Sequence, residues 1–281
     1  MVFEQTQSAV EFSSNCSSES TSEDVSFPRR VVDNEGSHRH WSAITRWYLC
    51  AVRLVAGCAR GALAAAASRS AVTDGSTRRA SAARLAALVA AIGPVAYIVL
   101  TIVLGLLWDG YDPIRDTQSE LGAVNSPYQA SMNIGGFMGL GVCILSFAVA
   151  FGLVLRGGWA KVLVLVLIGI AGVGMVVVGF FPCDADCVDV TRTGRLHGTF
   201  SAPGAIGLPV AAMLSSLVFR IDGRFGTWWQ VVSFWVGLVA LASGPVIQAE
   251  LAPEWNGLLQ RAAMWPPLFW MSAVSVRLQR L

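Results

Sequence analysis

Residues 85–107 have the sequence LAALVAAIGPVAYIVLTIVLGLL, and residues 109–122 continue with DGYDPIRDTQSELG. The first stretch is apolar and exceeds the roughly 20 residues that a helix needs to cross a bilayer. The second stretch carries four carboxylates around a single arginine, Arg115. Because charged side chains are unfavourable in lipid, we expect this polar segment at a membrane surface or in a wet cavity that opens onto it.

The composition of the chain indicates a membrane protein. Of the 281 residues, 54% are hydrophobic and only 14% are charged, whereas a soluble domain normally has about 25% charged residues. The charges are concentrated in the N-terminal part and in short loops, as in a protein that crosses a membrane several times. Lysine is nearly absent, while alanine, glycine and valine abound. This bias favours a bacterial genome rich in GC, and hence the bacterial inner (plasma) membrane. Basic residues that line a membrane edge give no support for nucleic-acid binding.

The N-terminal part is expected to differ from the rest. Residues 1–40 are polar and are predicted to be a disordered tail, followed by a basic linker at residues 41–83. In that linker arginines recur every seven residues, at Arg46, Arg53 and Arg60. The spacing places them near one face of a helix and predicts an amphipathic helix on the membrane surface. The alternative is that translation starts downstream, for instance at Val72.

Residues 84–281 are predicted to form an all-α membrane bundle of six transmembrane helices. The expected spans are residues 84–108, 126–155, 162–181, 197–219, 227–247 and 258–276. After the first span, Asp112 before a proline suits a helix start and Gly122 suits a helix end, so a short surface helix is expected there. Two adjacent prolines, Pro266 and Pro267, are expected to kink or break the last span.

The distribution of basic residues predicts the orientation. If six spans alternate, one side of the membrane holds Arg46, Arg53, Arg60, Arg69, Arg78, Arg79, Arg84, Arg156, Lys161, Arg220, Arg224, Arg277 and Arg280. The other side holds Arg115, Arg192, Arg195 and Arg261. The positive-inside rule therefore places both termini in the cytoplasm. The opposite face then collects the acidic residues Asp109, Asp112, Asp116, Glu120, Asp184, Asp186, Asp189, Glu250 and Glu254.

Short motifs in these loops and helix ends resemble a known family. They are Tyr111-Asp112, Ser119-Glu120-Leu121-Gly122, Asn133, Phe181-Pro182-Cys183-Asp184, His197 and Gly257-Leu258-Leu259-Gln260-Arg261. Their order and their positions relative to the spans are similar to those of the bacterial membrane family called domain of unknown function 998. The resemblance covers about residues 85–281. It implies a bundle of several spans and no established activity.

The polar motif residues all fall on the predicted non-cytoplasmic side, where one histidine accompanies several carboxylates. His197 has a reference pKa of about 6.5, which suits a general acid or base. We predict that His197, Glu120 and Asp184 carry out proton transfer. The alternative for His197 is that it caps the fourth span and binds a loop carbonyl. Ser119 is a further candidate, as a nucleophile assisted by His197.

The same face supplies the candidate ligand-binding residues, which are Asp112, Asp116, Ser119, Asn133 and Arg261. Asp112 has the alternative role of a helix cap. Arg261 is expected to pair with Glu120 or Asp184, or to bind an anionic head group, because an unpaired charge near the membrane is unfavourable. A histidine with carboxylates allows a divalent ion, but the spacing indicates no metal site, and no cofactor is predicted.

Two further patterns concern the second acidic loop and the last spans. Cys183 and Cys187 share that loop, and an oxidising compartment favours a disulfide between them over free thiols. The last two spans are rich in tryptophan and proline. These side chains either pack in the core or form an apolar cavity suited to an isoprenoid or lipid tail: Trp235, Trp265, Trp270, Pro245, Pro266 and Pro267.

Three functions are compatible with these features. The first is a membrane-embedded enzyme that acts on a lipid or isoprenoid by acid–base chemistry at the outer face. The second is a small-molecule or proton-coupled transporter, although the halves of the chain show no repeat and no charge lies deep in a span. The third is a non-catalytic membrane sensor or assembly protein whose acidic loops form a recognition surface.

Overall fold

The computed structural model describes residues 75–248 and 252–281, and within these ranges it contains helices and no strands. The long helices are α3 (Gly75–Leu107), α4 (Gly139–Val154), α5 (Gly158–Val178), α6 (Arg192–Asp222), α7 (Thr227–Gln248) and α8 (Asn256–Gln279). The short ones are η1 (Ser119–Gly122), η3 (Ala185–Cys187), η4 (Pro253–Trp255) and a π-helical segment, η2 (Ser131–Met138), that continues into α4. The predicted all-α bundle of six helices is confirmed. The predicted tail and the amphipathic helix lie outside the described residues.

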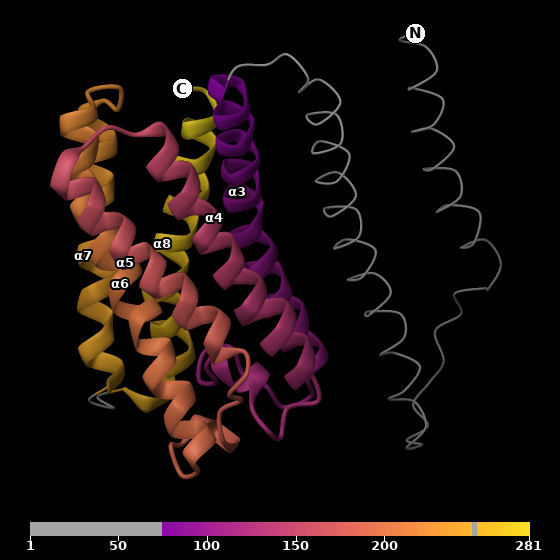
Figure 1. Ribbon diagram of the computed structural model, residues 1–281. Helices are drawn as coiled ribbons and strands as arrows, with labels where there is room; N and C mark the ends of the chain where they lie inside the picture. The colour runs from indigo at the N-terminus through magenta and orange to yellow at the C-terminus, as the bar shows by residue number, and fades with distance from the viewer. Residues whose placement is uncertain (1–74, 249–251) are drawn as a thin grey trace, which may run out of the picture. The chain divides into compact units, whose positions relative to one another are not determined.

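The long helices form a ring in chain order (Figure 1). Each helix contacts the next one along the chain, and α8 packs against α3 to close the ring. Successive helices run in opposite directions, so the connections gather at two ends. We call one end the loop end, because it has the long connections 108–130 and 179–191 and the start of α8. We call the other the basic end, which has the short connections 155–157 and 223–226 and the C-terminus.

The outer surface of this bundle is apolar. In the described ranges, the stretches long and apolar enough to cross a membrane are Thr77–Leu107, Ser131–Val154, Gly158–Val178 and Arg192–Asp222. Only 39–44% of the residues in their most apolar windows are buried inside the protein. The others face outward, an arrangement that would be strongly unfavourable in water. Helix α7 adds a shorter apolar stretch, Thr227–Ser243. These are the helices of an integral membrane protein.

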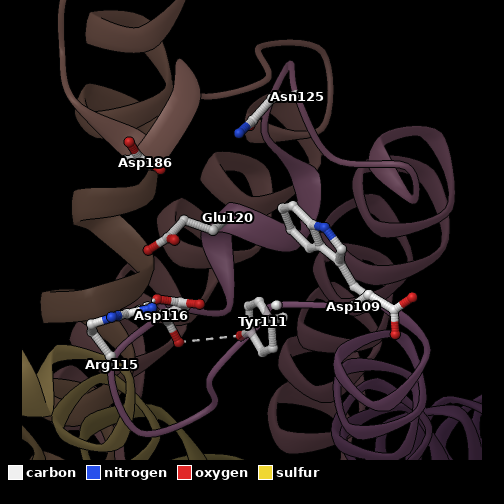
Figure 2. A pocket seen from close by; sticks show the side chains of 9 residues that line it. Asp109, Tyr111, Arg115, Asp116, Glu120, Asn125 and Asp186 are labelled. Atoms are coloured by element: carbon white, nitrogen blue, oxygen red, sulfur yellow. Dashed lines mark hydrogen bonds and ion pairs between the residues drawn. The ribbon is translucent and has the colours of Figure 1, made fainter.

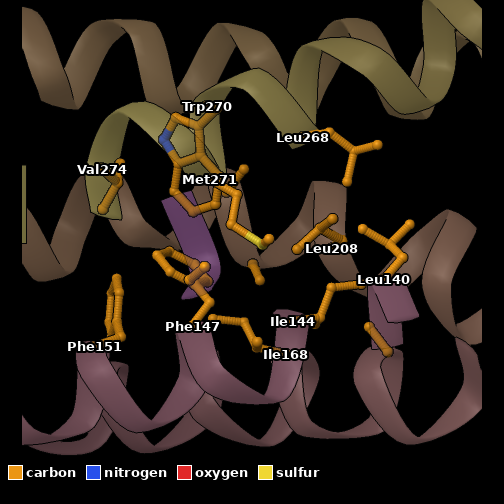
Figure 3. Close-up of a cluster of buried hydrophobic side chains, with 14 of the residues drawn as sticks. Leu140, Ile144, Phe147, Phe151, Ile168, Leu208, Leu268, Trp270, Met271 and Val274 are labelled. Carbon is orange, nitrogen blue, oxygen red and sulfur yellow. The ribbon is translucent and has the colours of Figure 1, made fainter. Parts of the chain in front are cut away.

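The centre of the ring is filled by side chains from α4, α5, α6 and α8 (Figure 3). Phe147 and Phe151 of α4 are fully buried, and the ring of Phe147 meets the edge of Trp270 at 5.5 Å between centroids. Ile168 and Leu208 approach the same cluster from α5 and α6. Trp270 therefore belongs to the core rather than to an apolar cavity, and its indole N–H donates to a buried serine hydroxyl of α7 at 2.8 Å.

Helices α4 and α5 approach closely because each has a glycine at the crossing. A Cβ on Gly141 would lie 2.8 Å from the carbonyl oxygen of Gly172, and a Cβ on Gly172 would lie 3.2 Å from that of Gly141. In lipid there is no hydrophobic driving force between two apolar helices, so their association depends on small residues that let the two backbones approach closely. This crossing is one such contact.

Three local predictions differ from the structure. The expected helix between Asp112 and Gly122 is wrong, since residues 113–116 form a turn and only Ser119–Gly122 is helical. Helix α8 has no break at its two prolines. Pro267 is buried against neighbouring helices, and such packing lets a membrane helix continue despite lost backbone hydrogen bonds. Helix α3 begins at Gly75, upstream of the predicted first span.

The glycine crossing gives a testable prediction. Gly141→Ala should destabilise the protein by about 1–3 kcal/mol, because its Cβ would overlap backbone atoms of α5 that cannot move independently. Gly169→Ala is the control, since nothing lies within 4 Å of its Cβ position; it should be neutral or stabilise by up to about 1 kcal/mol. Unfolding of the purified protein in detergent measures both. Equal effects would contradict the close crossing.

Candidate functional site

The acidic segment after α3 folds into a compact turn held by its own carboxylates. Asp112 Oδ1 accepts a hydrogen bond from the Ile114 N–H at 2.9 Å, and Asp116 Oδ2 accepts one from the Asp112 N–H at 2.7 Å. The Asp116 N–H donates to the Asp112 carbonyl at 2.6 Å. Asp112 therefore caps a turn. Arg115 pairs with Asp116 at 3.1 Å on the exposed side.

Arg261, in the second turn of α8, fixes this segment to the bundle. Its side chain is buried, with 8% exposed. Its Nη1 donates to the carbonyl oxygens of Pro113 (2.6 Å), Asp116 (3.0 Å) and Gly257 (2.9 Å). Contrary to one of the expectations above, the guanidinium has no ion pair with Glu120 or Asp184 in the described structure, because backbone oxygens satisfy its donors instead.

Tyr111 completes the contact. Arg261 Nη2 donates to the Tyr111 hydroxyl at 2.6 Å, and that hydroxyl donates to the carbonyl of Thr117 at 2.8 Å. Burial raises the pKa of Tyr111 to about 12, although the adjacent guanidinium acts in the opposite direction. The hydroxyl therefore keeps its proton at neutral pH and holds the second half of the segment in place.

The first turn of α8 binds the same backbone. The N–H groups of Gly257 and Leu258 donate to the carbonyls of Arg115 and Ile114, each at 2.9 Å. A helix start leaves such N–H groups without partners inside the helix, and the loop supplies them. A Cβ on Gly257 would meet loop carbonyls closer than contact distance, so glycine permits this approach. These bonds also explain why the predicted surface helix is missing, because the carbonyls of Ile114 and Arg115 accept hydrogen bonds from α8 and not from their own segment.

Two glutamines make a second attachment. Gln118 is buried. Its backbone N–H donates to Gln260 Oε1 at 2.6 Å, and its side-chain Oε1 accepts from the Trp265 indole N–H at 2.9 Å. Gln260 Nε2 donates to the Ser119 hydroxyl at 3.4 Å. Ser119, a predicted ligand-binding residue, thus lies in the contact between the loop and α8. Gln118 itself belongs to no recognisable motif and was not predicted.

Glu120 is held by Thr117. Its Oε1 accepts hydrogen bonds from the Thr117 N–H at 2.8 Å and from the Thr117 hydroxyl at 2.9 Å. A threonine followed three residues later by a glutamate matches the sequence of a capping box, and the bond from the Thr117 N–H to the Glu120 carboxylate is one half of that motif. Burial raises the pKa of the half-buried Glu120 carboxyl, and the bonds from Thr117 only partly oppose this; Asp116 and Asp186 raise it further.

A cavity of about 230 Å³ lies beside Glu120 at the loop end (Figure 2). It is lined by Trp108, Asp109, Gly110, Tyr111, Arg115, Asp116, Glu120, Asn125 and Asp186. Figure 2 shows the Glu120 carboxylate between Asp186 and the Arg115–Asp116 pair, whereas the Asp109 carboxylate points away. The rings of Trp108 and Tyr111 stack with centroids 5.7 Å apart. The cavity therefore combines an excess of carboxylates with an aromatic wall.

Only part of the predicted site lines this cavity. Asp116 and Glu120 line it. The other predicted site residues do not: Asp112, Ser119, Asn133, Asp184, His197 and Arg261. Asp109 and Asp186 were noted only as members of the acidic face, and Trp108, Arg115 and Asn125 were not predicted as site residues. For Trp108 and Arg115, a neighbouring aspartate in the sequence was the available signal; Asn125 has no such neighbour.

His197 and Asn133 are buried next to Phe137. His197 Nδ1 lies 2.8 Å from the carbonyl oxygen of Phe181, and because a carbonyl only accepts, Nδ1 carries the proton. The alternative expectation for His197 was that it binds a loop carbonyl, and this contact matches that expectation. The imidazole meets the Phe137 ring edge-on, and its Nε2 is buried without a partner among the described residues. Asn133 Nδ2 donates to the Gly122 carbonyl at 2.9 Å.

Asp184 organises the second acidic loop. Its Oδ2 accepts from the N–H groups of Val190 (3.0 Å) and Thr191 (2.7 Å), and its Oδ1 accepts from the Thr191 hydroxyl at 2.7 Å. The same hydroxyl accepts from the Gly194 N–H and so caps α6. The bonds from Thr191 keep the pKa of Asp184 below its usual value, despite burial. Asp184 therefore has a structural role: it holds the residues that precede α6 and the threonine that caps this helix.

Cys183 and Cys187 are joined by a disulfide in the described structure, with Cα atoms 5.0 Å apart. The short loop that they close contains Asp186, and both Asp186 and Cys187 have positive φ angles (55° and 51°). The Cys183 carbonyl accepts from the Val124 N–H at 3.0 Å, which joins the two long loops. This connection brings Asp186 to the cavity.

Within residues 75–248 and 252–281, no group of three His, Cys, Asp or Glu side chains is arranged to hold a metal ion.

Comparison with known proteins decides the family. The model of the family described as Protein of unknown function (DUF998) matches residues 91–277. The chain belongs to this family. No curated protein and no solved structure matches it. The matched range begins inside α3 and ends inside α8, so it includes the helix ring and both loops that line the cavity.

In this DUF998 protein, many motif residues hold the loop end together. Tyr111, Asp112 and Arg261 fix the first loop, and Asp184 fixes the second. Glu120 differs, because its second carboxylate oxygen has no hydrogen bond to a described residue and its side chain lines the cavity. Among the motif residues, Glu120 is therefore the best candidate for contact with a ligand.

The contact between Arg261 and the loop predicts a large loss of stability on substitution. Arg261→Lys should cost about 2–4 kcal/mol, because one ammonium group cannot donate to carbonyls and a hydroxyl that lie in different directions. Arg280→Lys, at the exposed end of the same helix, should change the stability by less than about 0.5 kcal/mol. Unfolding in detergent measures both. A negligible effect of Arg261→Lys would show that the loop does not depend on this guanidinium.

The second loop predicts a dependence on pH. Because the folded-state pKa of Asp184 is lowered, its contribution to stability is present above the usual pKa of about 3.9 and is lost as pH falls through the lowered value. Asp184→Asn should lower the melting temperature at pH 7, and its difference from the wild type should shrink below about pH 4. Asp189→Asn, in the same loop, is the control and should have little effect. A constant difference from pH 7 to pH 3 would contradict the role of the carboxylate.

Proposed function

We propose that this integral membrane protein binds an amine-bearing lipid head group in the acidic cavity and that Glu120 carries out acid–base chemistry on it. The observation that supports the proposal is the lining of the cavity. Its lining includes four acidic residues and one arginine, and that arginine is already paired with Asp116. The remaining negative charge favours a cation, and the stacked rings of Trp108 and Tyr111 favour an ammonium group in particular.

The position of the cavity supports a lipid as the source of that group. Helix α3 ends at Leu107, immediately before Trp108. Leu106 and Leu107 are 81% and 46% exposed on the outer surface of the bundle. A lipid whose chains lie along this part of α3 would bring its head group to the cavity. An isoprenoid phosphate, the other class expected from the sequence, has no cationic group for the carboxylates and is disfavoured by their charge.

We assign proton transfer to Glu120 rather than to His197 or Asp184. Its raised pKa lies closer to neutral pH than that of an ordinary carboxyl, which suits a general acid or base. Asp184 uses both of its oxygens to hold the second loop. His197 does not line the cavity, and its Nδ1 is bound to a carbonyl. Asp186, beside Glu120, favours the protonated form of Glu120 until a cation binds.

The experiment compares lipids of different head-group charge. The purified full-length protein is titrated in detergent with phosphatidylethanolamine, phosphatidylcholine or phosphatidylglycerol, and bound lipid is counted by native mass spectrometry. Phosphatidylethanolamine should bind at the acidic cavity, and phosphatidylglycerol should not. Glu120→Gln and Asp186→Asn should each weaken this binding by about tenfold, as expected for the loss of a charge-assisted contact.

Asp189→Asn is the matched control for this experiment, because it removes a carboxylate from the same loop as Asp186 but outside the cavity lining. It should bind phosphatidylethanolamine like the wild type. Equal effects of Asp186→Asn and Asp189→Asn on phosphatidylethanolamine binding would refute the proposal. Binding without any head-group turnover in a lipid extract would refute its catalytic part alone.

A further inference from the structure

The basic end of the bundle has one acidic residue in its described part, and that residue is already neutralised. The charged side chains near this end are Arg78, Arg79, Arg84, Arg156, Lys161, Arg220, Arg224, Arg277, Arg280 and Asp222. Asp222 accepts two hydrogen bonds from the Arg224 guanidinium, each at 2.7 Å, and one from the Arg156 N–H at 2.7 Å. The other basic residues therefore give this end an excess of positive charge.

Arg220 differs from Arg224 in its surroundings. It lies in the last turn of α6. Its side chain is exposed and has no hydrogen bond or ion pair with any residue of the described ranges. It borders a shallow groove of about 310 Å³ between α6 and α7, which lie side by side (Figure 1). The groove is lined by Ser216, Leu217, Arg220, Gln230, Val231, Phe234 and Trp235.

The groove changes from polar to apolar along its length. Helix α7 starts at Thr227 at the basic end, so Gln230 lies in its first turn and Trp235 lies roughly 12 Å from the start of the helix. Phe234 and Trp235 are 40% and 56% exposed, and they face the same surroundings as the outer apolar surface. The order along the groove is therefore a guanidinium and an amide near the membrane surface, followed by aromatic and aliphatic walls at greater depth.

We propose that this groove binds an anionic phospholipid, with its phosphate at Arg220 and an acyl chain along Val231, Phe234 and Trp235. A guanidinium binds phosphate oxygens in a forked geometry, and Arg220 has its donors available for this. The surrounding positive charge selects lipids with a net negative head group over zwitterionic ones. This site is at the opposite end of the bundle from the acidic cavity, so it does not depend on the function proposed above.

The test uses the full-length protein in detergent, with native mass spectrometry of phosphatidylglycerol and phosphatidylcholine binding. The wild type should retain phosphatidylglycerol in preference to phosphatidylcholine. Arg220→Gln should weaken phosphatidylglycerol binding by about fivefold or more. Arg280→Gln removes the same charge from the same end but outside the groove, and should weaken it by less than about twofold. Equal losses in the two variants would show a diffuse basic surface and overturn the proposal.

A second variant tests the groove without changing the charge. Ser216→Trp places a large side chain between the groove walls, so it should reduce phosphatidylglycerol binding as strongly as Arg220→Gln. The melting temperature without added lipid shows whether each variant is folded. If Ser216→Trp is folded and binds phosphatidylglycerol like the wild type, the groove is not the site.

Discussion

The guanidinium of Arg261 is a buried positive charge whose donors are satisfied by backbone oxygens and a tyrosine hydroxyl. A charge can be buried near a membrane only when its hydrogen bonds are complete, and the first acidic loop completes them. Two further carbonyls of this loop, of Ile114 and Arg115, accept from the N–H groups of Leu258 and Gly257 at the start of α8. Since these oxygens are used in this way, the loop cannot close into a helix. It stays as a turn whose carboxylates remain available to border a cavity.

The two ends of the bundle have opposite chemical character. The loop end has a cavity with excess negative charge and an aromatic wall, while the basic end has an unpaired arginine above an apolar groove. The helices between them supply an apolar outer surface and a tightly packed interior. The two proposed ligands are both lipids, but the acidic cavity would bind the ammonium group of one and the basic groove the phosphate of the other, at opposite ends of the bundle. The bundle is thus suited to distinguish the two leaflets by charge.

The sequence predicted the helices well because their signal is local. Apolar stretches of membrane length are visible in the chain itself, and so are the loops that separate them. The continuous helix through Pro267 was not predicted, because it depends on packing between helices. The prediction that both termini are cytoplasmic rests on charge alone and stays a prediction.

The site was predicted only in part, for a similar reason. The acidic character of the loop end was visible in the sequence, and Asp116 and Glu120 do line the cavity. The partner of Arg261 was not visible, because backbone carbonyls leave no trace in residue identity. His197 was ranked first for its chemistry, yet its place beside Phe137 depends on how α6 packs against η2. The threonine three residues before Glu120 was a local signal that could have been used, since its N–H binds the Glu120 carboxylate.

The bond between Arg261 and the Pro113 carbonyl joins residues 148 positions apart in the chain. During synthesis the acidic loop therefore leaves the ribosome long before its partner exists. Five helices can enter the membrane while the carbonyls of that loop remain hydrated and its carboxylates have no fixed positions. The arrival of α8 closes the helix ring and orders the loop in one event. The cavity lining therefore takes its final arrangement only once α8 is in place.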